Sequence, residues 1–503
     1  MPKANHRLTP YLHLESRFKR VHVLRSITHL LRWDQEVLMP TGSAAIRADQ
    51  LALLDMECSS ILHSRRVALL LDKAEAGENA LTDWQRANLR EMRRLWHRAN
   101  AIPKRLLNSL HSSTTRAEVR WRRAHEENNF SLLAPLQERV LQVVREKARR
   151  LGETLKCSPY DALLDEHDPG RQTREIDALF QALEKGLPPI IERTVQDQAE
   201  KPFIPFSGTI SIARQRDLGK KLMRCMGFPF DKGRLDESLH PFTEGTSEDL
   251  RITSKFDERN FLTGLMGVLH ETGHAMYDFG LPPDWFFQPV GRDRGMALHE
   301  GMALFLEMIV GRSREFMRFA APWMQRIFGV SGPAWDAENL YRQATRVSKT
   351  LIRMDADEVT YSLHILIRYD LEKEIFDGTL RLKDLPEAWN EKYRQRLGRA
   401  PATAREGCLQ DSHWPTAYFG YFPSYALGAI TASQVYNGLI RERPEAFDAV
   451  AMGDFSGLFD WLNQRIYSLG SRFTNHELME QSTGENLNPD LFLSYLRNKY
   501  LPS

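Results

Sequence analysis

The sequence predicts a mainly α-helical fold with a small antiparallel β-sheet just before a helix that carries a His-Glu-x-x-His motif. Residues 10–75 and 300–500 place apolar side chains at helical spacing, with short turn signals between the helical stretches. Residues 200–260 instead contain short β-branched or alternating runs, which are typical of strands. The motif lies in residues 268–277, within a further helical pattern.

Composition and charge narrow the class of protein. The 503 residues are 42% hydrophobic and 27% charged, which is typical of a soluble globular protein. The net charge of +2 favours no polyanionic partner, so we expect no nucleic acid. We see neither a secretory signal nor an apolar run approaching 18 residues, and therefore expect a cytoplasmic protein without a membrane span.

The four cysteines lie far apart and form no Cys-x-x-Cys pair. They are Cys58, Cys157, Cys225 and Cys408. This spacing predicts reduced thiols and argues against both a disulfide framework and a sulfur-ligated zinc site.

The N-terminal helices are separated by recognisable start and stop signals. Met-Pro-Thr-Gly at residues 39–42 should break the first helical stretch. Thr82 and Gln85 form a capping box that starts an arginine-rich helix. We expect these arginines to form a solvated face, because no nucleic-acid fold motif accompanies them.

Further along, residues 115–155 predict one long amphipathic helix, residues 160–170 a loop, and residues 173–196 another helix. Residues 209–212, 233–242 and 249–253 are strand-prone, and one edge of their sheet is suited to hold an extended peptide. Because no repeat or linker is visible, we expect residues 1–503 to form one unit.

The His-Glu-x-x-His motif predicts a metal centre. On a helix, His270 and His274 lie one turn apart on the same face, so both rings can reach one ion. Glu271 leans toward the same side and is placed to act as a base on a water molecule. Gly267 and Gly273 bare this face, either to leave room for substrate or to let a neighbouring helix pack closely.

A third ligand has to come from elsewhere, since the short motif alone occurs by chance in roughly one or two chains per hundred. Glu300 and Glu307 lie two turns apart on one later helical stretch. We favour Glu300 as the ligand and Glu307 as its neighbour or as an alternative ligand; a charged pair on a solvated face is the competing interpretation. The whole pattern predicts a zincin-like helical protein, with two halves around a deep substrate groove.

Several separate motifs give the chain a resemblance to a known family. They are Asp-x-Arg-x-Thr at 249–253, the metal motif at 270–274, His-Glu at 299–300, Ile-Arg-x-x-Ala-Asp at 352–357 and Gly-x-x-Gln-Asp-x-His-Trp at 407–414. Shorter similar segments lie at 33–36, 240–243 and 420–425. From about residue 10 to its end, the chain resembles the carboxypeptidase Taq family of metallocarboxypeptidases.

The resemblance implies a metal-dependent carboxypeptidase that removes single amino acids from the C-terminus of peptides. It also implies a homodimer, a zinc ion that cobalt can replace, and Glu271 as the general base. The alternatives are an oligopeptidase of the same fold that cuts internally and an inactive homologue that only binds peptides. The first would act equally on amidated peptides, and the second would bind them without turnover.

A carboxypeptidase needs a cation for the free carboxylate of its substrate, and arginine offers a fork of donors for it. Arg353 is the first candidate by resemblance, with an ion pair to Asp355 or Asp357 as the competing interpretation. Arg251 is the second candidate, although a structural role in the sheet is equally consistent with its position.

The resemblance also assigns polar side chains to the substrate. His413 and Tyr421 are expected to donate hydrogen bonds to the tetrahedral intermediate, and Tyr425 is an alternative donor. His240 and Gln410 are expected to help position the substrate. Two features depart from the family: Gly-Met at 301–302 replaces the usual Ser-Gln, and the loop 284–289 is unusually aromatic. Both leave the ligands intact and alter the expected shape of the substrate pocket.

Overall fold

The computed structural model describes residues 8–502, and its chain is mainly helical, as predicted. The first helices are α1 (Thr9–Val37), α2 (Ala44–Leu62), α3 (Arg65–Glu75), α4 (Asp83–Ala101), α5 (Lys104–Glu126), α6 (Ala134–Leu155), α7 (Pro159–His167), α8 (Thr173–Glu200) and α9 (Ile212–Cys225). The strands are β1 (Gly233–Glu237), β2 (Phe242–Thr246) and β3 (Asp249–Ser254).

The later helices follow the sheet. They are α10 (Phe261–Phe279), α11 (Met296–Leu304), α12 (Arg314–Phe328), α13 (Ala337–Ala344), α14 (Tyr361–Asp377), α15 (Leu385–Leu397), α16 (Pro423–Glu442), α17 (Ala446–Ala451), α18 (Ser456–Arg465), α19 (Asn475–Thr483) and α20 (Pro489–Tyr500). Short turns that bear on the site are η4 (Pro283–Trp285), η5 (Pro289–Gly291), η8 (Arg353–Asp355) and the π-helical segment η6 (Phe305–Val310).

Local signals explain where the helix predictions were right and wrong. The capping box of α4 is confirmed, with reciprocal hydrogen bonds between Thr82 and Gln85. The single helix expected over 115–155 was wrong, because Asn128 adopts a left-handed φ of 52° between α5 and α6. The loop expected over 160–170 was also wrong at its start, since the Ser158 side chain caps α7.

The sheet is mixed, which corrects the expected antiparallel arrangement. The strand order is β1-β3-β2; β2 pairs antiparallel with β3, and β1 pairs parallel with it. The tight turn between β2 and β3 makes them a hairpin. β1 joins the free edge of β3 and runs in the same direction. The expected strand at 209–212 is absent from the structure, where Ile212 begins α9.

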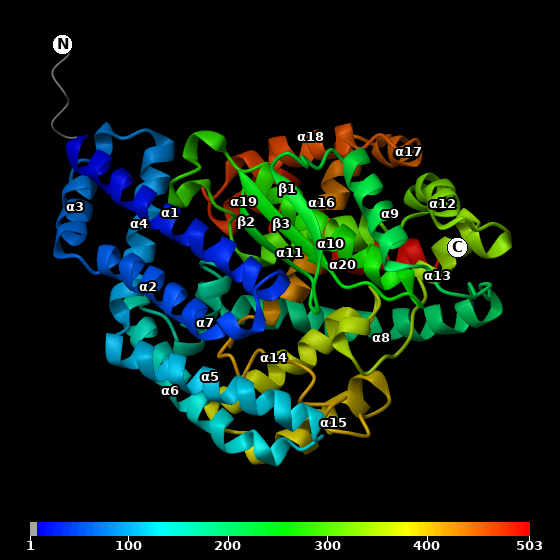
Figure 1. The fold of residues 1–503 in the computed structure, drawn as a ribbon, viewed down its shortest axis with the longest axis horizontal. Coiled ribbons are helices and arrows are strands. Elements are labelled where there is room, and N and C mark those ends of the chain that lie inside the picture. Colours follow the sequence, from blue (N-terminus) through cyan, green and yellow to red (C-terminus); the bar gives the residue numbers. More distant parts are fainter. Residues whose placement is uncertain (1–7, 503) are drawn as a thin grey trace, which may run out of the picture.

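One face of the sheet packs on α10, and α1 lies beside β2 (Figure 1). Leu250 and Ile252 of β3 are buried with Val268 and Ala275 of α10 in one apolar cluster. Alternate residues of a strand share a face, so both β3 side chains point to the helix. The sheet thus fixes the position of the helix that carries the metal motif.

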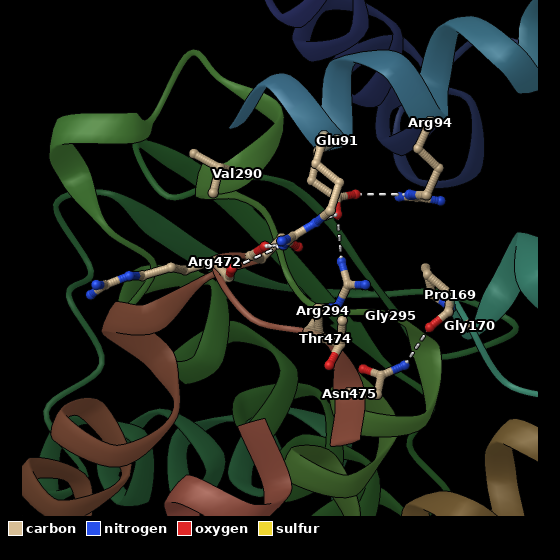
Figure 2. A network of polar contacts seen from close by, with 12 residues as sticks. Glu91, Arg94, Pro169, Gly170, Val290, Arg294, Gly295, Arg472, Thr474 and Asn475 are labelled. Carbon is tan, nitrogen blue, oxygen red and sulfur yellow. Dashed lines mark hydrogen bonds and ion pairs between the residues drawn. The ribbon is translucent and has the colours of Figure 1, made fainter. Parts of the chain in front are cut away.

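The N-terminal helices α1–α4 have an apolar core of their own, separate from the large core formed by most of the remaining helices. Figure 1 shows these four helices gathered at one end of the molecule. A buried ion pair links the two parts: Arg294 Nη1 and Glu91 Oε1 are 2.9 Å apart (Figure 2). In Figure 2 Glu91 lies between Arg94 and Arg294. Arg294 is in the segment just before α11 begins.

The arginines of α4 do more than form a solvated face, because most of them bind groups on other elements. Arg90 donates to the backbone near residue 472, Arg93 pairs with acids of α3, and Arg98 pairs with Asp165 of α7. All four cysteines are free. Among residues 8–502, every helix is too short or too polar to span a lipid bilayer.

Candidate metal centre and active site

The face of α10 that carries the motif lies against α11. A Cβ on Gly273 would sit 2.6 Å from the backbone oxygen of Met302 and 2.7 Å from Cα of Ala303. A side chain at this position would therefore push the two helices apart. Of the two interpretations of this glycine, close helix packing is the one that the structure supports, and it brings Glu300 within reach of the motif.

α11 is held equally closely on its other side by α16. A Cβ on Gly301 would meet the Thr431 side chain at 2.9 Å, and a Cβ on Gly428 would meet Cγ of Glu300 at 2.8 Å. The departure at residues 301–302 thus has a packing consequence, since α16 approaches α11 across Gly301. The Glu300 side chain, which projects from α11, is confined between α10 and α16.

The structure brings the three predicted ligands together. His270 Nε2 and His274 Nε2 lie 3.8 and 3.7 Å from Oε2 of Glu300. One donor atom from each residue lies within 4.8 Å of the other two. Donors that are each about 2.1 Å from a tetrahedral ion lie roughly 3.4 Å apart, so the two distances to Glu300 are only slightly longer than a bound ion requires.

The donor set and its charge both fit a divalent cation. Burial lowers the pKa of His270, but Glu300 and Glu307 outweigh it and raise this pKa to about 10. The two carboxylates therefore create a strongly negative potential at the ring. A metal ion would replace the proton at the same lone pair, because only the deprotonated imidazole nitrogen binds metal.

Glu307 lies behind the ligands, as the first of its two predicted roles requires. Its Oε2 is 3.1 Å from Nδ1 of His270, and its Oε1 is 2.8 Å from Nη2 of Arg312. The hydrogen bond at Nδ1 orients the ring and turns Nε2 toward Glu300. Glu307 belongs to the π-helical segment η6, a kind of local irregularity that is frequent at functional sites.

His274 is oriented by a residue to which the sequence analysis gave no role of its own. The ring of His299 stacks on the ring of His274, with centroids 4.3 Å apart and planes inclined by 17°. Asp278 Oδ1 lies 3.3 Å from His299 Nε2, so Asp278 supports the ligand through His299. The signal was present in the sequence, since His299 precedes the chosen ligand directly.

Glu271 points toward the sheet and is held there by Thr243 of β2. The Thr243 hydroxyl donates to Oε2 of Glu271 over 2.7 Å. Burial raises the pKa of Glu271, while His270 and the Thr243 hydroxyl oppose this effect. A carboxylate with a raised pKa is suited to accept and return a proton near neutral pH.

Metal analysis of two variants tests the ligand assignment. Glu300→Ala should lose most of the bound metal, because it removes one of three donors. Glu307→Ala should retain metal with roughly 10–100-fold weaker affinity, since it removes only the support of His270. Inductively coupled plasma mass spectrometry after dialysis against a chelator series would distinguish them, and the reverse order would overturn the assignment.

Arg353 is held by Asp411, which sequence reasoning did not name as its partner. Nε and Nη2 of Arg353 lie 3.1 and 3.0 Å from Oδ1 of Asp411, and Arg368 binds Oδ2 over 2.7 Å. Neither expected partner is used: Asp357 instead accepts hydrogen bonds from Ser348 and Thr360. Nη1 of Arg353 takes part in neither of its bonds to Asp411.

Gln410 supports this arginine and is fully engaged by the protein. Its Oε1 accepts from the backbone N–H of Arg353 and from Nη2 of Arg368, over 2.9 and 2.7 Å. Its Nε2 donates to the carbonyls of Leu351 and Glu406. The geometry therefore points to a role for Gln410 in positioning Arg353, and its expected role in positioning the substrate stays a prediction.

His413, Tyr421 and Tyr425 lie together beside Arg353. The hydroxyl of Tyr425 is 3.2 Å from Nε2 of His413, and the rings of Tyr421 and Tyr425 meet edge to face at 5.3 Å. Burial lowers the pKa of His413 to about 4, so its ring is neutral near pH 7. Arg353 itself lies over the ring of Tyr425 at 4.9 Å.

A buried carboxylate that the sequence analysis missed fixes the segment bearing these residues. Glu372 of α14 accepts from the hydroxyl of Tyr160, the indole of Trp414 and the backbone N–H of Gly420. Burial outweighs these three donors and raises the pKa of Glu372 to about 7. The bonds to Trp414 and Gly420 bracket the turn between His413 and Tyr421.

Two predicted substrate residues lie apart from this group. Arg251 pairs with Asp249 and covers the ring of the buried Trp33 at 4.2 Å, so it ties the sheet to α1. This is the structural role that we considered as its alternative. The side chain of His240 is exposed in the turn between β1 and β2, where its carbonyl accepts from Ser238.

A cavity of about 200 Å³ adjoins the metal centre. Thr243 and His299, which contact Glu271 and His274, both contribute to its wall. The aromatic loop before α11 lies at its far side, where Phe286 packs edge-on to His22 of α1 at 4.7 Å. Phe286 of this loop therefore forms part of the cavity wall.

A His-Glu-x-x-His helix, a glutamate from the next helix and a cleft beside a small sheet define a helical metallopeptidase. Comparison with known proteins identifies the family within this class. Residues 13–500 match the model of the carboxypeptidase Taq (M32) metallopeptidases. The chain belongs to this family, and it is a metal-dependent carboxypeptidase, an enzyme that hydrolyses peptides.

Individual relatives agree over almost the whole chain. Thermostable carboxypeptidase 1 of Thermus thermophilus is 36% identical over 492 residues, which is 95% of each chain. Carboxypeptidase 1 of Bacillus subtilis is 31% identical over 96% of each chain. The structure of Trypanosoma cruzi metallocarboxypeptidase 1 is 36% identical, with a TM-score of 0.95 over 98% of this chain and 100% of that one. These findings favour the carboxypeptidase interpretation over internal cleavage.

Proposed function

We propose that His270, His274 and Glu300 bind one zinc ion and that Glu271 is the general base of peptide hydrolysis. The convergence of three donor atoms within 4.8 Å is the observation that carries this proposal. Two nitrogens and one carboxylate oxygen suit zinc, and cobalt can replace it in such a set. The ion, when bound, would acidify water and polarise the scissile carbonyl.

Glu271 would move the proton in this reaction. It takes a proton from the attacking water and passes it to the leaving amine, so that one carboxylate serves both steps. Thr243 holds one oxygen of Glu271 over 2.7 Å, which fixes the orientation of the carboxylate during both transfers. Its raised pKa favours acceptance of the proton.

His413, Tyr421 and Tyr425 would stabilise the negative oxygen of the tetrahedral intermediate. The neutral ring of His413 and the two phenols can each donate a hydrogen bond. Burial is the main cause that raises the pKa of Tyr425 to about 12, so its hydroxyl stays protonated.

Arg353 would bind the free carboxylate of the peptide. Nη1 takes no part in the bonds to Asp411, and the guanidinium remains charged throughout the accessible pH range. Asp411 and Gln410 keep the fork in place. A charged hydrogen bond of this kind is worth about 1.5–3 kcal/mol.

Peptides with blocked C-termini test the proposal directly. C-terminal amidation should lower kcat/KM by about 10–100-fold or more, because Arg353 loses its anionic partner. Mass spectrometry of free and amidated versions of one peptide would measure this change. Equal rates on both peptides would favour an endopeptidase and contradict the role of Arg353.

The remaining expectations stay predictions. The homodimer is expected from the family resemblance and the cytoplasmic location from the lack of a visible secretory signal; analytical ultracentrifugation tests the first of them. The proposal that the chain acts as one unit gains support from the buried Arg294–Glu91 pair between α4 and the start of α11.

A further inference from the structure

Two arginines on the wall of the 200 Å³ cavity have no polar partner in the part of the chain that the structure describes. Arg25 comes from α1 and Arg292 from the segment after η5. Within residues 8–502, neither side chain forms a salt bridge or a hydrogen bond with another residue. Half-buried guanidinium groups are normally paired, since removing them from water is costly.

Burial and mutual repulsion both act against the charges of these two arginines. Burial and the charge of Arg25 lower the pKa of Arg292 to about 10, although the charge of Asp293 opposes them. His22 lies near both, and neither of its ring nitrogens has a hydrogen-bond partner. Burial and the nearby arginines lower its pKa to about 4, so His22 is a neutral donor.

The acidic groups of the same wall are already engaged. Glu244 pairs with His29 over 2.6 Å, and Asp278 lies 3.3 Å from His299. Asp293 accepts a hydrogen bond from the backbone N–H of Gly295. The cavity therefore offers two guanidinium groups that form no ion pair with these carboxylates.

The cavity lies on a different wall from the proposed carboxylate site. Its lining comes from α1, β2, the end of α10, the loop before α11, and His299. Arg353 and Tyr425 belong instead to η8 and α16. A peptide with its C-terminus at Arg353 and its scissile bond at the metal ligands would extend its preceding residues toward β2 and this cavity.

We propose that Arg25 and Arg292 form a specificity subsite for an acidic side chain, Asp or Glu, of a peptide substrate on the N-terminal side of the scissile bond. The proposal rests on the function proposed above. Two guanidinium groups provide the planar, charged donors that bind a carboxylate best. The cavity volume of about 200 Å³ has room for one such side chain.

Matched peptides test this subsite in the zinc-loaded enzyme. Each pair has the same C-terminal residue and differs only by Glu or Gln at one of the three preceding positions. The wild-type enzyme should favour Glu at one position by about 10-fold or more in kcat/KM, because a charge-assisted hydrogen bond is lost with Gln. Arg25→Met with Arg292→Met should remove this preference and leave kcat/KM for the Gln peptide unchanged.

Arg32→Met is the matched control, since Arg32 also lies on α1 but is exposed. It should keep the wild-type preference. Equal wild-type rates for Glu and Gln at all three positions would overturn the proposal, and no variant is needed for that result. An equal loss for both peptides in the double variant would also overturn it, because it would indicate a structural role.

Calorimetric binding to the Glu271→Gln variant separates this proposal from the proposed function. There the Glu peptide should bind about 10-fold more tightly than the Gln peptide without being hydrolysed. If the wild-type enzyme released no residue from any peptide while this difference in binding persisted, the catalytic proposal would fail and the subsite for an acidic side chain would stand.

Discussion

Glu271→Gln is expected to lower kcat by about 10³-fold, within the range typical of a lost general base. The amide cannot accept a proton from water, yet its oxygen can still accept the hydrogen bond from Thr243. The variant should therefore fold, bind metal and bind peptide. Mass spectrometry of peptide ladders, together with the metal content of the purified protein, measures both halves of this result.

The control for this variant is Glu248→Gln, an exposed glutamate in the turn after β2. It should behave as the wild-type enzyme. A Glu271→Gln protein with wild-type kcat would contradict the proposed base. Loss of metal together with activity would instead indicate that Glu271 is a ligand.

Asp411→Asn is expected to cost about 3–5 kcal/mol of stability, because it leaves two buried arginines without their countercharge. Arg368 is fully buried and Arg353 is 8% exposed, so water cannot replace the lost carboxylate. The two arginines hold the pKa of Asp411 far below its usual value. The midpoint of denaturant unfolding, with the same metal load, would measure the loss.

The same change should also raise KM, since Arg353 loses the bonds that aim it at the substrate. Asp355→Asn is the matched control, because Asp355 is exposed and lies within η8 two residues from Arg353. It should change the stability by no more than about 0.5 kcal/mol. An Asp411→Asn enzyme as stable as this control would show that the buried network contributes little.

The structure bears out those predictions from sequence that rest on local spacing. Residues four apart on a helix share a face, so the pairing of His270 with His274 needed no knowledge of the rest of the chain. The capping box at Thr82 is equally local, and the structure contains it. The choice of Glu300 over Glu307 drew on spacing and resemblance, and the structure places Glu300 beside both rings.

Contacts between distant segments lay beyond such reasoning. Arg353 and Asp411 are 58 positions apart, and the sequence offered nearer acids at 355 and 357. Thr243 and Glu271 meet only because β2 and α10 pack together. Whether β1 pairs parallel or antiparallel with its neighbour likewise depends on which edge of the β2–β3 hairpin it joins.

By itself, then, the sequence determined the helical class and the family, and it predicted the side chains that the structure brings together as a candidate metal site. Each of these depends on spacing within one segment or on motifs that stand together. Only the tertiary structure decided that Arg353 pairs with Asp411 and that Glu307 supports His270. It also decided which arginines have no ion-pair partner among the described residues. The physical reason is that burial and charge compensation are properties of a three-dimensional neighbourhood. Arg25 and Arg292, 267 positions apart, look like ordinary surface residues until folding places them on one cavity wall.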